Sequence, residues 1–150
     1  MSSAASKPKV GIVVVTHEGA AEALVMAARA LLGNLPGVAA VTCAMADAFP
    51  TLVDKIARGC QLVDEGVGVV MLVDLHGSSP FHASMSLLDG TRVAEILCGV
   101  NLPMLIKVST IDRTRLTPTQ IAEALRDIGR RSIRIGSELT GRISLSEKLP

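Results

Sequence analysis

Aromatic residues are almost absent from this sequence, whose 150 residues include no Trp, no Tyr and two Phe. Proteins that bind single-stranded nucleic acid by stacking need aromatic side chains beneath the bases. The formal net charge is +1. The arginines between Arg126 and Arg134 alternate with Asp127 and apolar residues, a pattern typical of a solvated helix face. We therefore expect no nucleic-acid partner.

Other patterns are missing as well. No apolar run approaches the ~18 residues of a membrane span, and no CxxC pair offers a zinc site. Residues 1–8 are polar and lead directly into an apolar strand, which predicts a disordered tail rather than a signal peptide. Cys43, Cys60 and Cys98 are widely spaced among apolar residues. They predict reduced core thiols in a cytoplasmic protein.

The residues that are abundant predict a single domain over residues 9–150. Hydrophobic residues make up 49% of the chain and charged residues 19%. This composition fills a core and carries too little charge for a disordered chain. Because aromatic residues are scarce, the core must consist of Val, Leu, Ile, Met and Ala. Such a core is typical of a parallel sheet with helices on both faces.

Short β-branched runs alternate with helical patterns, which predicts an α/β fold with a doubly wound, mostly parallel open sheet flanked by helices. Gly33 ends the first helical pattern, and Thr117 with Gln120 predicts a capping box for the last one. The predicted strands are 10–16, 38–44, 67–73 and 93–100, with 142–146 as a C-terminal antiparallel edge strand; the predicted helices are 20–32, 50–65, 81–88, a short one after 103, and one from 118 whose apolar side includes Ile133 and Ile135.

Two predicted strands are followed by residues that can carry chemistry. His17 follows the first strand, and Asp74 follows the third, shortly before Gly77, Ser78 and Ser79. Right-handed crossovers bring the carboxyl ends of parallel strands to one edge of the sheet, where ligands bind. We expect the first and third strands to be neighbours, so that these residues converge.

Together these residue types suit phosphoryl-group chemistry. A neutral imidazole such as His17 attacks through one ring nitrogen when a carboxylate such as Asp74 holds the other. Gly77 permits close backbone approach, and Ser78 and Ser79 add hydroxyls at a predicted helix start, where free N–H groups favour anions. Because neither GxxxxGK[ST] nor GxGxxG occurs, we expect no nucleotide and no other cofactor.

Other interpretations of the same residues stay open at this stage. Taken alone, His17 is typical of a loop histidine with structural hydrogen bonds. A metal site built from His17, His76 and His82 with Asp74 would suit zinc or nickel. A histidine phosphatase would carry an arginine where Thr16 stands.

Three segments resemble the mannose-family IIA components of the bacterial phosphoenolpyruvate-dependent sugar phosphotransferase system. VVTHEGAAEALVMAARALLG resembles the opening of the family, and VVMLVDLHGSSPFHAS resembles its stretch (L/V)-x-D-x-x-G-G-S-P-F-N-A. VAEILCGVNLPML resembles its Gly-Val-Asn-aliphatic-Pro-Met segment. The segments occur in the family's order, and the resemblance covers roughly residues 9 to 140.

The resemblance implies a cytoplasmic phosphocarrier that forms a homodimer, in some members with a C-terminal strand exchanged between subunits. It implies that phospho-HPr passes a phosphoryl group to His17, that Asp74 orients this histidine, and that Ser79 lies beside the group. The group then moves to a IIB component and on to sugar. Asn101, in the third segment, is expected near the edge of the site.

The sequence departs from the family pattern at several positions. Glu18 stands where the family usually has Gly; an acid there either repels the incoming phosphoryl group or lies outward on the first helical turn. His76, Ser78 and His82 also replace the usual residues. We expect no IIB unit within these 150 residues beside the IIA-like region. A second hypothesis is therefore a non-catalytic dimeric regulatory or interaction module that has kept the IIA fold.

Overall fold

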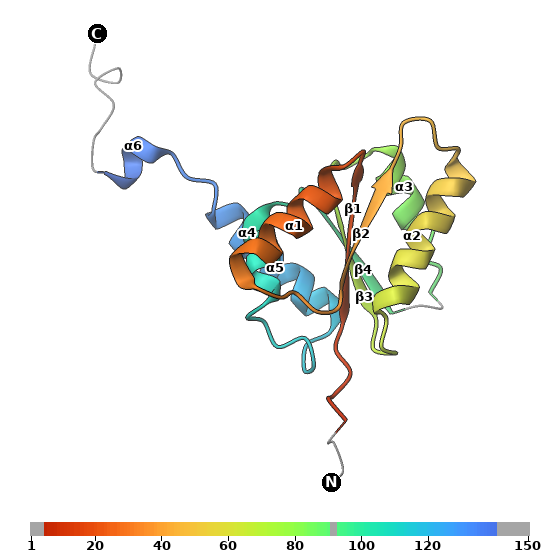
Figure 1. Ribbon diagram of the computed structural model, residues 1–150, viewed down its shortest axis with the longest axis horizontal. Coiled ribbons are helices and arrows are strands. Elements are labelled where there is room, and N and C mark those ends of the chain that lie inside the picture. The colour runs from red at the N-terminus through yellow and green to blue at the C-terminus, as the bar shows by residue number, and fades with distance from the viewer. Residues whose placement is uncertain (1–4, 91–92, 141–150) are drawn as a thin grey trace.

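The computed structural model describes residues 5–90 and 93–140, which form an α/β fold around a parallel sheet (Figure 1). The sheet order is β2-β1-β3-β4, and each neighbouring pair of strands is parallel. The predicted fold class and the predicted adjacency of the first and third strands are both confirmed. The strands are β1 (Gly11–His17), β2 (Val38–Cys43), β3 (Val69–Val73) and β4 (Ala94–Cys98).

Helices cover both faces of the sheet, as a doubly wound topology requires (Figure 1). One face carries α1 (Ala20–Leu32), α4 (Leu102–Val108) and α5 (Pro118–Arg131); the other carries α2 (Phe49–Val63) and α3 (Ser79–Met85). A short helix, α6 (Gly136–Leu139), stands apart from this body (Figure 1). None of the helices within the described residues is long and apolar enough to cross a membrane.

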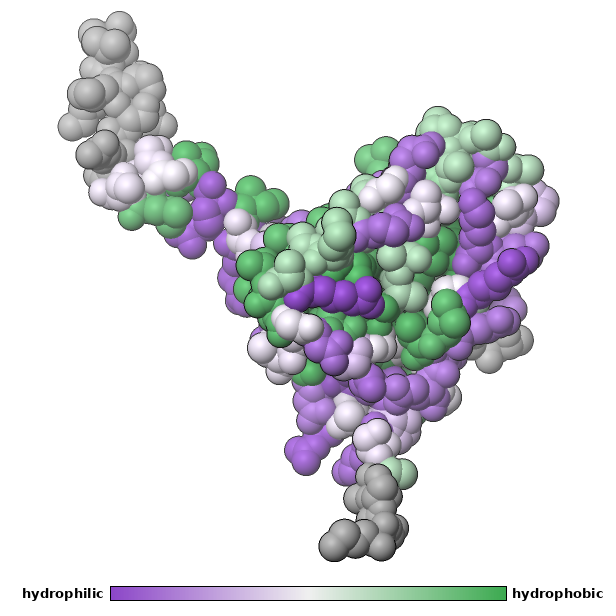
Figure 2. Space-filling view, viewed as in Figure 1, coloured by the Kyte–Doolittle hydropathy of each residue, from purple (hydrophilic) through white to green (hydrophobic). Residues whose placement is uncertain are grey.

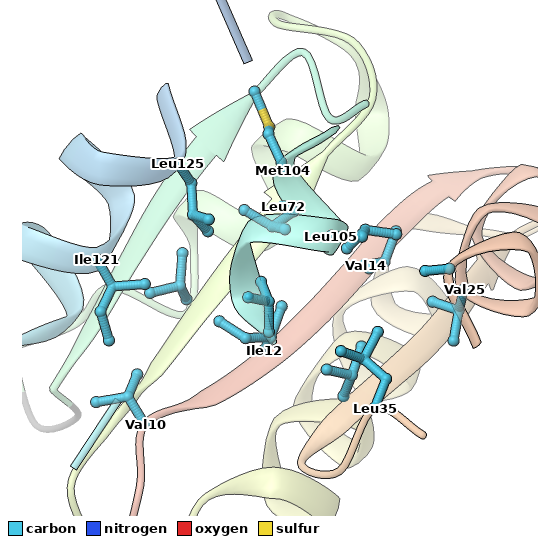
Figure 3. Close-up of a cluster of buried hydrophobic side chains, with 14 of the residues drawn as sticks. Val10, Ile12, Val14, Val25, Leu35, Leu72, Met104, Leu105, Ile121 and Leu125 are labelled. Carbon is cyan, nitrogen blue, oxygen red and sulfur yellow. The ribbon is translucent and has the colours of Figure 1, made fainter. Parts of the chain in front are cut away.

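The two central strands, β1 and β3, are buried on both faces, so their residues alternate between two cores. In β1, Ile12 and Val14 pack towards α1, α4 and α5, the cluster drawn in Figure 3. Val13 and Val15 pack towards α2 and α3. Burial of a side chain of this size contributes roughly 1.5–3 kcal/mol relative to exposure. Mostly aliphatic residues thus fill both cores and hold β1 in the centre of the sheet.

Local signals fix the ends of several helices as the sequence predicts. Helix α1 ends at Gly33, whose φ of 79° is readily adopted by glycine. Helix α5 begins with a complete capping box: Thr117 Oγ1 accepts from the N–H of Gln120, and Gln120 Oε1 accepts from the N–H of Thr117. Local chemistry thus sets the end of α1 and the start of α5.

Some predictions about the C-terminal part and the cysteines need correction. Helix α5 ends at Arg131, so Ile133 and Ile135 do not belong to its apolar side; they are 78% and 60% exposed. Cys43 and Cys60 are buried in the core as predicted, whereas Cys98 is only half-buried. The predicted strand 142–146 lies outside the described residues, as do residues 1–4 of the predicted tail.

Candidate active site

The parallel pairing of β1 with β3 brings His17 and Asp74 together. His17 ends β1, and Asp74 directly follows β3, whose Val73 is aligned with Val15. The Nδ1 atom of His17 lies 2.9 Å from Oδ2 of Asp74. The backbone N–H of His17 donates to the same oxygen, also at 2.9 Å. One carboxylate oxygen therefore fixes both the backbone and the ring of the histidine.

This contact determines which ring nitrogen is available. With Nδ1–H donating to Asp74, the neutral imidazole keeps its lone pair on Nε2. The side chains of His17 and Asp74 are 31% and 26% exposed, so the ring is accessible although it is held in place. The pair has the geometry of an oriented nucleophile: the carboxylate of Asp74 fixes Nδ1 of His17, and Nε2 is left to attack.

The second oxygen of Asp74 is buried and lacks a hydrogen-bond partner in the part of the chain that the structure describes. An unpaired buried acceptor is costly, by about 1–3 kcal/mol. Within the described residues, the hydrogen bonds to the Asp74 carboxylate therefore come from the ring and the backbone N–H of His17.

A small hollow of about 80 Å³ opens beside His17. Ser79 and Pro80 of α3 form one part of its lining, and the remaining residues come from the end of β2, the loop after it and α2. Of the three predicted phosphate-binding residues, Ser79 thus reaches the hollow together with His17. The lining consists of His17, Cys43, Ala44, Met45, Asp47, Leu52, Ser79 and Pro80.

Gly77 and Ser78, the other two predicted phosphate-binding residues, shape the turn that precedes Ser79. Ser78 Oγ donates to the carbonyl of Leu75 at 2.7 Å and accepts from the N–H of Phe81 at 3.3 Å, which caps α3. Gly77 has φ of 77°, a conformation that favours glycine. Both residues therefore act on the position of Ser79 rather than on the lining of the hollow.

Asn101 caps α4 and does not appear in the lining of the hollow. Its Oδ1 accepts from the N–H of Met104 at 3.2 Å, and its Nδ2 donates to the carbonyl of Gly129 at 3.3 Å. The oxygen of the amide thus caps α4, and its nitrogen joins α4 to α5. The expected place of Asn101 near the edge of the site stays a prediction.

Glu18 does not lie in the first turn of a helix, so that prediction is wrong. Helix α1 begins at Ala20, after Gly19, and Glu18 belongs to the preceding loop with φ of 44°. Its carboxylate accepts from the N–H of Met45 at 2.9 Å. The acid next to the nucleophile therefore binds the loop that follows β2.

Sequence reasoning missed the residues that β2 and its loop contribute to the hollow. Cys43, Met45 and Asp47 lie at the same carboxyl edge of the sheet as His17. The signal was available, because the second predicted strand ends at residue 44 and its loop must reach this edge. None of these residues carries a motif that marks it.

The two remaining histidines pack against a phenylalanine. The ring centroids of His76 and Phe81 are 4.8 Å apart, and those of Phe81 and His82 are 5.2 Å apart. Within residues 5–90 and 93–140 there is no group of three or more His, Cys, Asp or Glu side chains placed to hold a metal ion. The metal-site alternative built from His17, His76 and His82 thus has no geometric support.

Cys43 is a second nucleophile-type residue in the lining, but its thiol is not activated. Burial raises the pKa of Cys43 to about 11, and the negative charges of Asp47 and Asp74 act in the same direction, while Lys55 opposes them. The thiol is therefore protonated at neutral pH and a weak nucleophile. His17 is the better nucleophile of the two.

The family model for the PTS system fructose IIA component, EIIA-man, matches residues 11–125. The chain belongs to this family, the mannose-family IIA components of the sugar phosphotransferase system (PTS). The matched range contains β1 to β4 and every residue that lines the hollow. The resemblance stated from the three sequence segments is confirmed.

Individual relatives of this IIA chain agree with that assignment. It is 35% identical over 98 residues to the PTS system mannose-specific EIIAB component of Escherichia coli K12, a match that covers 65% of this chain and 30% of that protein. It is 25% identical over 117 residues to the PTS system sorbose-specific EIIA component of Lacticaseibacillus casei, covering 78% and 83% of the two chains. The match thus spans under a third of the length of the Escherichia coli protein.

Solved structures show the same fold. The phosphotransferase component EIIA from Streptococcus agalactiae superposes with a TM-score of 0.77 at 18% identity, over 86% of this chain and 98% of that one. The mannose/sorbose specific IIA subunit from Enterococcus faecalis superposes with a TM-score of 0.75 at 23% identity, over 85% and 94%. At these identities the likeness concerns the fold.

Proposed function

We propose that this chain is a PTS phosphocarrier that accepts a phosphoryl group from phospho-HPr on Nε2 of His17. It then passes the group to a IIB component, or its phosphorylation state serves as a regulatory signal. The observation that carries the proposal is the 2.9 Å contact between His17 Nδ1 and Asp74 Oδ2, which leaves Nε2 free beside the hollow. Membership of the IIA family supports the same assignment.

In the proposed step, the Nε2 lone pair of His17 attacks the phosphorus of the donor's phosphohistidine. A P–N bond to Nε2 forms while the P–N bond of the donor breaks, and the donor nitrogen keeps that electron pair. His17 becomes a phosphorylated imidazolium whose positive charge Asp74 stabilises. The transfer needs positioning and charge stabilisation, and the proposal includes no metal, nucleotide or other cofactor.

Ser79 is proposed to hold an oxygen of the phosphoryl group through its hydroxyl. Its place in the lining of the hollow beside His17 supports this role. Ser78 and Gly77 support it indirectly, because the cap and the turn fix where α3 begins. A charge-assisted hydrogen bond of this kind is stronger than one between neutral groups.

The partners that the proposal names are HPr as donor, a IIB component as acceptor and a second copy of this chain. Support for a homodimer comes from the segment after α5, where Ile133, Ile135 and Leu139 are exposed. Apolar side chains gather on this projecting segment (Figure 2), and exposed apolar groups of this kind are typical of subunit interfaces. Sedimentation equilibrium tests the proposed homodimer by measuring whether the mass in solution is twice that of one chain. Because the chain would work together with HPr, we also propose that it is cytoplasmic.

The experiment that tests the function is intact mass after incubation with phosphoenolpyruvate, enzyme I and HPr from the same organism. One added phosphate on the wild type, acid-labile and absent from His17→Ala, is the expected result. Subsequent loss of that phosphate to an added IIB component would identify the acceptor. A donor that is active on another IIA component but adds no phosphate here would favour the non-catalytic interaction module.

A further inference from the structure

The acid beside the nucleophile is held in an unusual backbone conformation. Among the described residues Glu18 alone combines a side chain beyond glycine with a positive φ, 44°. Such a conformation is costly and persists where the surroundings enforce it. Two bonds to the β2 region enforce it here: the N–H of Glu18 donates to the carbonyl of Cys43 at 3.0 Å, and its Oε1 accepts from the N–H of Met45 at 2.9 Å.

The loop that Glu18 binds, residues 44–48, is cross-linked within itself. The N–H of Asp47 donates to the carbonyl of Ala44 at 3.0 Å, and the N–H of Ala44 donates to Oδ2 of Asp47 at 2.9 Å. Lys55 Nζ lies 2.5 Å from the same oxygen and ties the loop to α2. These donors, Lys55 first, lower the pKa of Asp47, so the cross-links persist at neutral pH. The 44–48 loop therefore behaves as one unit.

This unit forms a wall of the hollow next to His17. Met45 and Asp47 both belong to the lining, yet the side chain of Met45 is 78% exposed and makes little packing of its own. The position of this wall therefore depends on the backbone of the 44–48 loop. The Glu18–Met45 hydrogen bond joins that backbone directly to the residue after the nucleophile.

We propose that Glu18 is a positioning residue for phosphoryl transfer, a role that rests on the proposed function of His17. By holding the N–H of Met45, its carboxylate keeps the 44–48 loop against the phosphoryl site and limits the access of water to phosphorylated His17. The same hydrogen bond places the negative charge of Glu18 against the N–H of Met45. The Glu18 carboxylate is thereby accommodated next to His17, which receives the anionic phosphoryl group.

Two variants separate the hydrogen bond from the charge. Glu18→Ala removes the acceptor, while Glu18→Gln keeps an oxygen that can accept from Met45 and removes the charge. The matched control is Glu22→Ala, which deletes an exposed acid in the first turn of α1 whose carboxylate accepts from the hydroxyl of Thr42, a residue of β2. All are studied as full-length, phosphorylated protein.

The readouts are the hydrolysis rate of the isolated phosphoprotein, the transfer rate at saturating phospho-HPr, and amide hydrogen exchange at Met45. For Glu18→Ala we expect hydrolysis about fivefold faster and transfer about fivefold slower, as the loss of one ordinary hydrogen bond predicts. Met45 should lose protection in that variant. Glu18→Gln and Glu22→Ala should stay within about twofold of the wild type in both rates. A role in folding alone would leave the hydrolysis rate per phosphorylated molecule unchanged.

The possible outcomes distinguish this proposal from the function on which it rests. If Glu18→Ala is phosphorylated at the wild-type rate and its phosphohistidine is hydrolysed at the wild-type rate, the positioning role is overturned. The proposed phosphocarrier function would not be affected by that result. A Glu18→Gln protein as impaired as Glu18→Ala would show that charge acts, and not the bond. A wild type that an active donor never phosphorylates would refute the phosphocarrier function and the positioning role together.

Discussion

His17 and Asp74, 57 positions apart in the sequence, meet through two contacts to a single carboxylate oxygen, one from the ring and one from the backbone. A surface ion pair between flexible side chains contributes little to stability. Here the backbone contact fixes the position of the carboxylate relative to the ring, so the geometry serves orientation. The predictions below separate this orienting role from stability and from the other residues of the hollow.

Asp74→Asn should slow phosphorylation of His17 far more than it destabilises the fold. The variant keeps the size of the side chain and an oxygen that can accept from both N–H groups of His17, but it removes the negative charge that stabilises the phosphorylated imidazolium. We expect a rate roughly 100-fold lower and a change in the free energy of unfolding below about 1 kcal/mol. Rapid-quench kinetics and urea unfolding measure the two effects. Transfer at the wild-type rate would remove Asp74 from the mechanism.

Ser79→Ala should lower the transfer rate about tenfold, because one charge-assisted hydrogen bond to the phosphoryl group is lost. The matched control is Ser86→Ala at the other end of α3, where Ser86 Oγ donates to the carbonyl of Ala83 at 2.7 Å. Steady-state kinetics with phospho-HPr compare the two variants. Equal rates in both would show that the hydroxyl of Ser79 does not contact the group.

Cys43→Ala should still accept phosphate. Because burial raises the pKa of this thiol to about 11, the thiolate is rare at neutral pH and should not compete with His17. Alkylation of Cys43 in the folded protein should therefore increase with pH as far as about 11. Intact mass after incubation with the donor system measures the first effect. A Cys43→Ala protein that folds and no longer takes up phosphate would contradict the assignment of His17.

Arg113→Met should destabilise the protein at the end of the sheet away from the site. Arg113, 7% exposed, donates to the carbonyls of Val10, Pro36 and Gly37 at 2.7–3.3 Å. Leaving these acceptors unpaired should lower the free energy of unfolding by roughly 3 kcal/mol. Urea unfolding measures the loss, and the exposed Arg115→Met is the control, with a change within about 0.5 kcal/mol. Equal losses would show that burial of Arg113 does not matter.

Much of the fold was readable because strand and helix signals agree along the chain. The first strand, predicted at 10–16 and observed at Gly11–His17, and the helix ended by Gly33 follow from local chemistry. The helix after Thr117 was extended too far, because Ile133 keeps a helical spacing although it has no surface to pack on within the described chain. The spacing of apolar residues indicates which side of a helix is apolar, but it does not show whether another element packs against that side.

The site was readable where topology alone places a residue. His17, Asp74 and Ser79 converge because parallel strands share one edge. Glu18 was misread, since its left-handed φ depends on bonds to β2 that no local pattern encodes. The expected place of Asn101 near the edge of the site stays a prediction; its capping of α4 and its bond to Gly129 of α5 depend on how the two helices pack, which no local pattern encodes.

The most direct test of the account is the position of the phosphoryl group on the imidazole. Protein labelled with ¹⁵N at histidine, phosphorylated through enzyme I and HPr, shows by ³¹P–¹⁵N coupling which nitrogen of which histidine is bonded to phosphorus. The contact of Nδ1 with Asp74 predicts phosphorus on Nε2 of His17. Phosphorus on Nδ1 of His17, or on His76 or His82, would contradict the account.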